Sequence, residues 1–152
     1  MNKGKYCYEY PRPAVTADVV AVAGNNEKEA SVLLIQRNIP PFKGMWALPG
    51  GFVNIDEELE TAAARELEEE TGLRNAGLKQ IGAFGKVGRD PRHRTVTIAF
   101  LACLPKEGLV KGGDDAGDAQ WFPLGDLPPL AFDHEEIIEE ALALWRSCDG
   151  NA

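Results

Sequence analysis

Apolar residues recur along the chain in short runs that are separated by glycine, proline and charged residues. Residues 14–23 (AVTADVVAVA) and 31–37 (SVLLIQR) are almost continuously apolar, which is typical of buried strands. The polar stretch between them is short, so we expect these two strands to form a hairpin. Shorter extended pieces are predicted at residues 46–48 and 52–53, on either side of a Pro-Gly-Gly turn.

The second half of the chain predicts more strands and a final helix. Residues 78–87 and 94–104 are strand candidates, and the second of these alternates in the way that a strand requires. Residues 105–118 are rich in glycine and aspartate and indicate a loop before a short strand at 120–122. An amphipathic helix is predicted over residues 133–145. Strands before and after a central helix, followed by a terminal helix, predict an α/β fold with a mixed sheet between helices.

The central helix lies in the segment GFVNIDEELETAAARELEEETGL, which begins at Gly51. We expect Asp56 to cap a helix over residues 57–71, and Gly72 to end it in a left-handed conformation. Four of the five residues from 66 to 70 are glutamates. Negative charge is unfavourable there, because the unpaired carbonyls at a helix C-terminus carry a partial negative charge of their own.

The helical period predicts the direction of these acids. At about 100° per residue, Glu66, Glu69 and Glu70 continue the stripe that is apolar in the first two turns. Unpaired buried carboxylates are costly, and hard divalent cations such as Mg²⁺ relieve that cost. The alternative is a solvated acidic helix end, which is the usual meaning of a charge run taken alone.

The fixed residues of this segment match the Nudix box at every position. They are Gly51, Glu57, Arg65, Glu66, Leu67, Glu69, Glu70, Gly72 and Leu73. The chain therefore resembles the Nudix hydrolase superfamily over nearly its whole length, as one domain covering residues 1–152. The resemblance implies an α/β/α sandwich with a central mixed β-sheet. It also implies hydrolysis of a nucleoside diphosphate linked to another moiety, by water attack at phosphorus with divalent metal.

The resemblance also implies a ligand set. Glu66, Glu69 and Glu70 are the expected metal ligands, together with the backbone carbonyl of Gly50, for Mg²⁺ or alternatively Mn²⁺. Family members divide the glutamate ligands differently, and Glu66 is the position that varies in its detailed role.

Two further box residues, Glu57 and Arg65, are expected to orient the acidic cluster. Arg65 can pair with Glu69 one helical turn away. The alternative for Arg65 is an exposed ion pair of little energetic value.

The general base is expected outside the box. In many relatives a carboxylate from a downstream loop assists the water, and Asp114 and Asp115 occupy such a loop, with Glu107 as a further candidate. The alternative is ordinary turn chemistry, in which glycine and aspartate are favoured.

A second charged segment, GRDPRHR over residues 88–94, joins two predicted strands. Arg89, Arg92 and Arg94 are candidates for binding substrate phosphates, because arginine forks bind phosphate oxygens in pairs. The alternative is a solvated hairpin tip. The chain resembles short ADP-ribose pyrophosphatases in three segments: this one, YPRPAVTADVV near the N-terminus and LAFDHEEII near the C-terminus.

Charge and composition limit the classes of binding partner that we expect. The formal net charge is −8, which argues against a nonspecific nucleic-acid or anionic-membrane surface. No signal peptide is apparent, and the three cysteines lack CxxC spacing, so we expect a cytoplasmic protein.

The leading hypothesis is a Mg²⁺-dependent hydrolase that converts ADP-ribose to AMP and ribose 5-phosphate, acting as a homodimer by resemblance. One alternative is a Nudix enzyme for oxidised nucleoside triphosphates or dinucleoside polyphosphates. The other is a sensor that binds ADP-ribose without cutting it. Because the chain ends soon after the last predicted helix, we expect no DNA-binding domain of the kind that some sensors carry.

Overall fold

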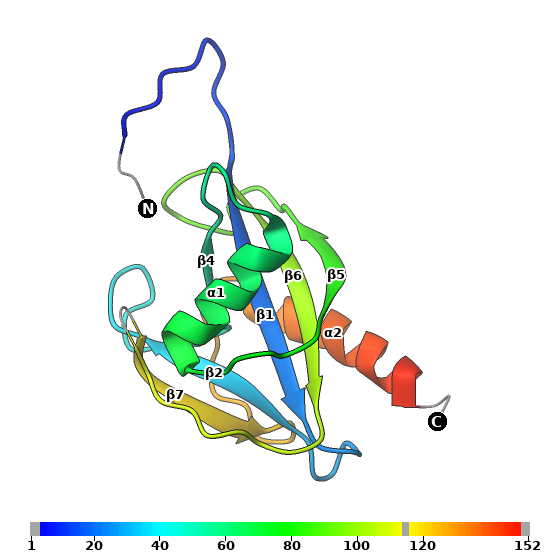
Figure 1. The fold of residues 1–152 in the computed structure, drawn as a ribbon. Coiled ribbons are helices and arrows are strands. Elements are labelled where there is room, and N and C mark those ends of the chain that lie inside the picture. The colour runs from blue at the N-terminus through cyan, green and yellow to red at the C-terminus, as the bar shows by residue number, and fades with distance from the viewer. Residues whose placement is uncertain (1–3, 114–115, 150–152) are drawn as a thin grey trace.

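Strand β1 lies at the centre of a seven-stranded sheet in the computed structural model, which describes residues 4–113 and 116–149 (Figure 1). The elements, in chain order, are β1 (Ala14–Ala23), β2 (Ser31–Arg37), β3 (Trp46–Ala47), β4 (Gly50–Phe52), α1 (Leu59–Thr71), β5 (Leu78–Phe84), β6 (Thr95–Leu104), β7 (Ala116–Pro123) and α2 (His134–Asp149).

The sheet is mixed. Its main path runs β3-β2-β1-β6-β5, while β4 pairs with β1 and β7 pairs with β2. Among the strands of residues 4–113 and 116–149, only the β1–β6 ladder is parallel, and it runs from Ala14 opposite Thr95 to Ala23 opposite Leu104. The predicted hairpin of β1 and β2 is confirmed, with Val22 opposite Val32 next to the turn.

One helix covers each face of the sheet (Figure 1). Ala17, Val19 and Ala21 of β1 pack in the same core cluster as the apolar stripe of α1. The alternate residues Val20 and Val22 pack in the cluster that contains α2. Because both faces of β1 are buried, its sequence is almost continuously apolar rather than alternating. The α/β/α sandwich is therefore confirmed.

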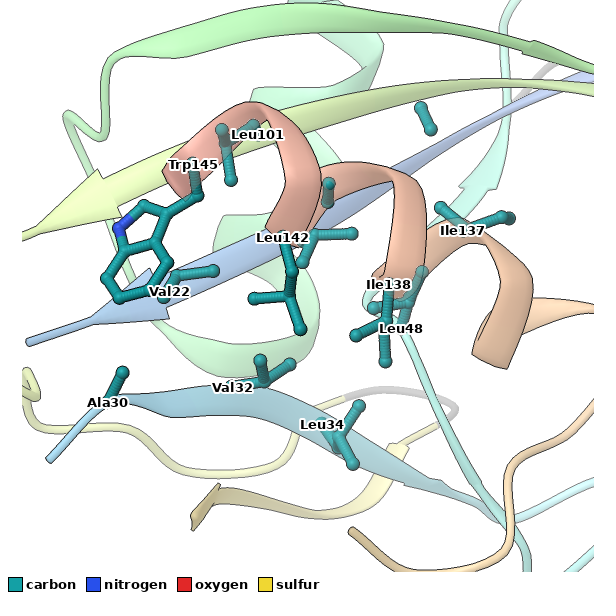
Figure 2. Close-up of a cluster of buried hydrophobic side chains, with 13 residues drawn as sticks. Val22, Ala30, Val32, Leu34, Leu48, Leu101, Ile137, Ile138, Leu142 and Trp145 are labelled. Atoms are coloured by element: carbon teal, nitrogen blue, oxygen red, sulfur yellow. The ribbon is translucent and has the colours of Figure 1, made fainter. Parts of the chain in front are cut away.

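The larger core cluster lies between α2 and the sheet. Figure 2 shows Ile138, Leu142 and Trp145 on the side of α2 that faces Val22 and Val32 of the strands. The Trp145 side chain is almost fully buried and closes the C-terminal end of this layer.

The start of α1 differs from the prediction. The helix begins at Leu59, and the N-cap position is Glu58, which makes no side-chain capping hydrogen bond. Asp56 lies in a turn before the helix, so its predicted capping role is wrong. The predicted end is confirmed, because Gly72 has φ of 77° and donates its amide hydrogen to the carbonyl of Glu68 at 2.8 Å.

The strand before α2 is longer than expected. We predicted a loop to residue 118, but β7 already begins at Ala116, opposite Arg37, and continues along β2 past an irregularity in register. Pairing with β2 thus makes a strand out of Gly- and Asp-containing residues that have little intrinsic preference for one.

In the part of the chain that the structure describes, no helix is both long enough and apolar enough to cross a membrane.

Candidate active site

A cleft opens at one end of the sheet, between the C-terminal half of α1 and the loops that follow β2 and β5. Its floor comes from the first residues of β1 and from β4, and one wall comes from the residues just before α2. The cleft therefore brings together the two charged segments that the sequence analysis singled out.

The three box glutamates line the same cleft. The Glu66 side chain is only 14% exposed, whereas that of Glu69 is 44% exposed and lies at the mouth. The Glu70 side chain reaches the floor, where its Oε2 accepts the amide hydrogen of Gly50 at 3.0 Å. The predicted stripe thus places two carboxylates inside and one at the rim.

Burial changes the acidity of the two inner carboxylates. It raises the pKa of Glu70 to about 8, and the neighbouring charges of Glu66 and Asp18 add to the effect of burial. Burial also raises the pKa of Glu66, against the opposing effect of its hydrogen bond from Arg65. The inner end of α1 therefore carries negative charge at an energetic cost, as expected of a site that takes a cation.

Arg65 connects the acidic cluster to the strand below it. Its Nε donates to Glu57 at 2.6 Å, and its Nη1 lies 2.7 Å from Glu66 and 3.2 Å from Glu69. Its Nη2 donates to the Phe52 carbonyl and again to Glu57. The hydrogen bond from Arg65 lowers the pKa of Glu57. Arg65 thus contacts three carboxylates and one backbone carbonyl and is not an isolated surface ion pair; its orienting role stays a prediction.

Two glycines make the close approach of acids to β4 possible. A Cβ atom on Gly51 would lie 2.5 Å from Oε1 of Glu66, and one on Gly50 would overlap the Asp18 carboxylate. The Pro-Gly-Gly turn therefore leaves space that carboxylate oxygens fill.

The carboxylates suit a hard divalent cation by their chemistry, although they are hydrogen bonded within the protein. Among the described residues, no three His, Cys, Asp or Glu side chains are placed together as a metal-binding group. Glu66 and Glu69 contact Arg65 instead, and Glu70 contacts Gly50. A cation that shared these oxygens would remove the cost of burying Glu66 and Glu70, so the residues present fit such an ion.

The arginines of the 88–94 loop separate in the structure. Arg89 is 4% exposed, and its Nε and Nη2 bind both carboxylate oxygens of Asp133 at 2.9 and 2.7 Å. Burial alone would lower the pKa of Arg89, but the Asp133 carboxylate raises it overall. Although Arg89 borders the cleft, it is held in a buried ion pair that fixes the loop to the start of α2.

Arg92 projects into the cleft between two aromatic rings. Its guanidinium carbon lies 5.4 Å from the Phe52 ring centroid and 5.8 Å from that of Phe132. Its Nε and Nη2 bind Asp90 at 3.0 and 2.7 Å, and Nη1 makes no hydrogen bond to the described residues. Burial would raise the pKa of Asp90, but the hydrogen bonds from Arg92 hold it below its ordinary value.

Two other predicted residues, Arg94 and Glu107, are not brought to the cleft. Arg94 is exposed and is not among the residues that line it. Glu107 is also exposed and away from it. Asp114 and Asp115 lie outside the described residues, so a general base among them stays a prediction.

Sequence reasoning missed a further cationic residue in the cleft, Arg37. Arg37, at the end of β2, donates its Nε to the Pro41 carbonyl at 2.7 Å and lies over the Phe132 ring at 4.9 Å. Burial and the charge of Arg92 lower the pKa of Arg37, as expected where two guanidinium groups meet. Its one sequence signal is a charged residue at the end of a buried strand.

A polar group at the floor of the cleft was missed as well. Asp18 interrupts the apolar run of β1, and His134 begins α2; both are almost fully buried. Burial lowers the pKa of His134, which favours a neutral ring. The visible signal was a single acid inside strand 14–23, where every other residue except one threonine is apolar.

Comparisons with known proteins agree with this site. A family model for the NUDIX domain matches residues 12–141. The ADP-ribose pyrophosphatase of Methanocaldococcus jannaschii is 45% identical to this chain over 128 residues, which cover 84% of the chain and 75% of that protein.

Two other similar proteins carry names other than pyrophosphatase. The ADPR responsive transcriptional repressor NtrR of Acinetobacter baylyi is 34% identical over 139 residues; the match covers 89% of this chain and 55% of the repressor, so the chain spans about half its length. The NUDIX domain of Shewanella oneidensis NrtR, solved with ADP ribose, has a TM-score of 0.82 at 33% identity, and 90% of each chain is covered.

Proposed function

The chain belongs to the Nudix family, and from this membership we propose that it is a divalent-metal-dependent pyrophosphatase that hydrolyses ADP-ribose to AMP and ribose 5-phosphate. The observation that carries the proposal is that acids and free arginine donors line one cleft. The three box glutamates of α1, called here the acidic side, share it with Arg37 and Arg92, called here the basic side, which have unused hydrogen-bond donors. This lining suits a diphosphate that binds a cation and guanidinium groups at once.

For the acidic side, we propose that Glu66, Glu69, Glu70 and the Gly50 carbonyl hold Mg²⁺, with Mn²⁺ as an alternative. When bound, such an ion neutralises phosphate charge and lowers the pKa of an attacking water. Arg65 would then orient the glutamates through the contacts that it already makes.

For the basic side, hydrogen-bond accounting favours Arg37 and Arg92. Arginine has five N–H donors, and Arg92 uses Nε and Nη2 on Asp90 while Arg37 uses Nε on Pro41. The remaining nitrogens of these two side chains make no hydrogen bonds within residues 4–113 and 116–149, so they can bind phosphate oxygens. Arg89 uses the same two nitrogens on Asp133, but its side chain is only 4% exposed, whereas that of Arg92 is 34% exposed. Arg89 is therefore better explained as a residue that positions the loop.

The choice of ADP-ribose rests on the relatives. The pyrophosphatase at 45% identity is named for this substrate, and the Shewanella oneidensis domain was solved with it. Other nucleoside diphosphate derivatives, oxidised nucleoside triphosphates and dinucleoside polyphosphates remain the enzymatic alternatives, because the box is common to all of them.

The second candidate function is an ADP-ribose sensor, which the similarity to the repressor NtrR favours. An intact set of box glutamates around the cleft supports hydrolysis instead, since binding alone does not require a metal-holding cluster.

The test is a substrate panel with excess Mg²⁺, in which AMP and ribose 5-phosphate are quantified by chromatography. We expect ADP-ribose to give the highest kcat/KM, and Glu69→Gln and Glu70→Gln to lose most turnover while remaining folded. Glu68→Gln is the matched control, because Glu68 lies on the same helix but pairs with Arg74 outside the cleft. Tight ADP-ribose binding without AMP release would support the sensor, and wild-type turnover in both glutamine variants would contradict the enzyme.

A homodimer also stays a prediction. Tyr6, Tyr8 and Tyr10 of the N-terminal segment, which extends away from the body of the molecule, are 56%, 44% and 72% exposed (Figure 1). We expect sedimentation equilibrium to give twice the monomer mass, and replacement of these three tyrosines by serine to weaken association if they are buried between copies.

A further inference from the structure

A buried polar cluster lies under the turn formed by residues 48–50. Asp18, Thr97 and His134 are 6%, 0% and 4% exposed, respectively. Asp18 and Thr97 lie on the neighbouring strands β1 and β6, at the level where their α2-facing residues change from apolar to polar. Buried polar side chains are unfavourable unless they bind one another, and here they do.

The other two side chains, Thr97 and His134, both approach the Asp18 carboxylate. Thr97 donates its hydroxyl hydrogen to Oδ2 of Asp18 at 2.6 Å. His134 Nε2 lies 3.9 Å from the same oxygen, which is an electrostatic contact rather than a hydrogen bond. On the other side of its ring, Nδ1 of His134 accepts the amide hydrogen of Leu48 at 2.9 Å. Since Nδ1 is an acceptor, the proton of the neutral ring is on Nε2, the nitrogen that faces Asp18.

The same carboxylate also packs against the turn itself. Asp18 lies opposite Gly50 in the β1–β4 ladder, and its Oδ1 occupies the space that a Cβ atom on Gly50 would need. Val19 donates its amide hydrogen to the Pro49 carbonyl at 2.9 Å, and Gly50 donates to Glu70 at 3.0 Å. The backbone of residues 48, 49 and 50 is thus fixed by three separate contacts around Asp18.

We infer that Asp18, supported by Thr97 and His134, is a positioning residue that fixes the 48–50 turn and thereby holds Glu70 and Gly50 in place at the floor of the cleft. This inference rests on the proposed function, in which Glu70 and the Gly50 carbonyl bind the divalent cation. Residues behind metal ligands commonly determine metal affinity in this way, and their loss typically costs about 10- to 100-fold in affinity or activity.

Asp18→Asn is the first variant, because it keeps the shape of the side chain and removes the negative charge that Thr97 and His134 face. We expect Mn²⁺, measured by electron paramagnetic resonance without substrate, to bind about 10- to 100-fold more weakly. We expect kcat for ADP-ribose to fall by a similar factor while KM changes less than twofold, because the hydrogen bonds of Arg37 and Arg92 are made to Pro41 and Asp90 and not to Asp18.

A metal-free measurement checks the same inference. We expect the amides of Leu48 and Gly50 to exchange with deuterium at least about 10-fold faster in Asp18→Asn than in the wild type, because local opening of the turn becomes easier. If Asp18→Asn fails to fold, Thr97→Val removes only the hydroxyl that binds Oδ2 and should give the same changes in milder form. Thr97→Ser keeps the hydroxyl and should restore wild-type behaviour.

Ser31→Ala is the matched control for stability alone, because Ser31 is buried on β2 away from the cleft. Wild-type Mn²⁺ affinity and wild-type exchange at Leu48 and Gly50 in both Asp18→Asn and Thr97→Val would overturn the inference. So would changes no larger than those of Ser31→Ala at an equal loss in Tm. If the wild type itself neither binds Mn²⁺ nor hydrolyses ADP-ribose, the proposed function fails, and the exchange data still decide whether Asp18 fixes the turn.

Discussion

The acidic end of α1 and the basic loop at residues 88–94 are equally conspicuous in the sequence, but they behave differently in the structure. The three glutamates of α1 all border one cleft. The three arginines of the loop go to three environments: a buried ion pair, the cleft and the outer surface. A cluster of like charges therefore predicted a site in one case and only part of a site in the other.

The difference follows from backbone regularity. On a helix, the period determines which side chains share a face, so the direction of Glu66, Glu69 and Glu70 can be derived without knowledge of the fold. In a loop, side-chain direction depends on partners that the fold supplies. Arg89 faces Asp133, which is 44 positions away in the chain, and no local pattern indicates that pair.

The largest expected effect tests whether Arg89 serves the structure. Arg89→Ala leaves the buried Asp133 carboxylate without its partner, so we expect a loss of about 3–5 kcal/mol in the free energy of unfolding, measured by urea titration. At a temperature where the variant is folded, KM for ADP-ribose should stay near the wild-type value. A wild-type unfolding curve together with a raised KM would instead indicate that Arg89 binds substrate.

The next effect concerns the other region. Glu70→Gln removes the most deeply placed carboxylate, and we expect kcat for ADP-ribose to fall by about 10²–10³, because loss of a preorganised electrostatic group has this typical size. Steady-state kinetics with Glu68→Gln as the control measures it. A loss of equal size in the control would mean that the cleft geometry does not distinguish the inner from the outer acids.

Smaller effects are expected from the two arginines that have unused donors. Arg37→Ala and Arg92→Ala should each raise KM for ADP-ribose about 10- to 100-fold, since a hydrogen bond to a charged group contributes about 1.5–3 kcal/mol. Lysine at either position should restore only part of the loss, because its ammonium cannot bind two oxygens as a planar fork does. Arg94→Ala is the control from the same loop, and an equal change in KM there would remove the distinction among the three loop arginines.

The smallest effect is a pH dependence of the metal-free protein. Burial raises the pKa of Glu70 to about 8, so between about pH 4.5 and 8 the folded state binds more protons at this group than the unfolded chain does. Stability from Glu70 is therefore present at low pH and decreases as the pH rises through this window.

The contribution of His134 to the pH dependence has the opposite sign, because burial lowers the pKa of its ring. The stability that it contributes increases as the pH rises toward the pKa of histidine in the unfolded chain. The two contributions oppose one another in the wild type, so a comparison with Glu70→Gln is needed to isolate that of Glu70. Each kcal/mol corresponds to about 2–4 °C in Tm for a domain of this size. Thermal melts in EDTA from pH 5 to 8 should show Glu70→Gln gaining stability relative to the wild type as the pH rises. A constant difference would contradict a raised pKa of Glu70.

The fold was predictable because its strands are buried and its turns carry glycine or proline. Continuous apolar runs indicated β1 and β2, and Gly72 indicated the end of α1. The start of α1 was not predictable in the same way. The Glu57 carboxylate accepts the Asn54 amide hydrogen and binds Arg65, and these contacts keep it outside the helix.

The candidate site was predictable only where its residues are close in sequence. The box contains all three glutamates of the acidic side. Arg37, Asp18 and His134 come from separate elements and meet only because β1, β2 and α2 converge on the cleft. Of these, Asp18 had the clearest local signal, since an acid in a buried strand requires a partner.

The parallel β1–β6 ladder has a consequence for the order of events during synthesis and folding. Ala14 of β1 can pair only after Thr95 of β6 has been synthesised, so the centre of the sheet forms late. Pairing between strands so far apart in sequence is intrinsically slow. The Thr97–Asp18 hydrogen bond spans the same ladder. A nascent chain that has not yet released β6 from the ribosome therefore has α1 in full, but β1 lacks its parallel partner and Asp18 lacks Thr97. On this basis the site is complete only when the middle of the sheet has formed.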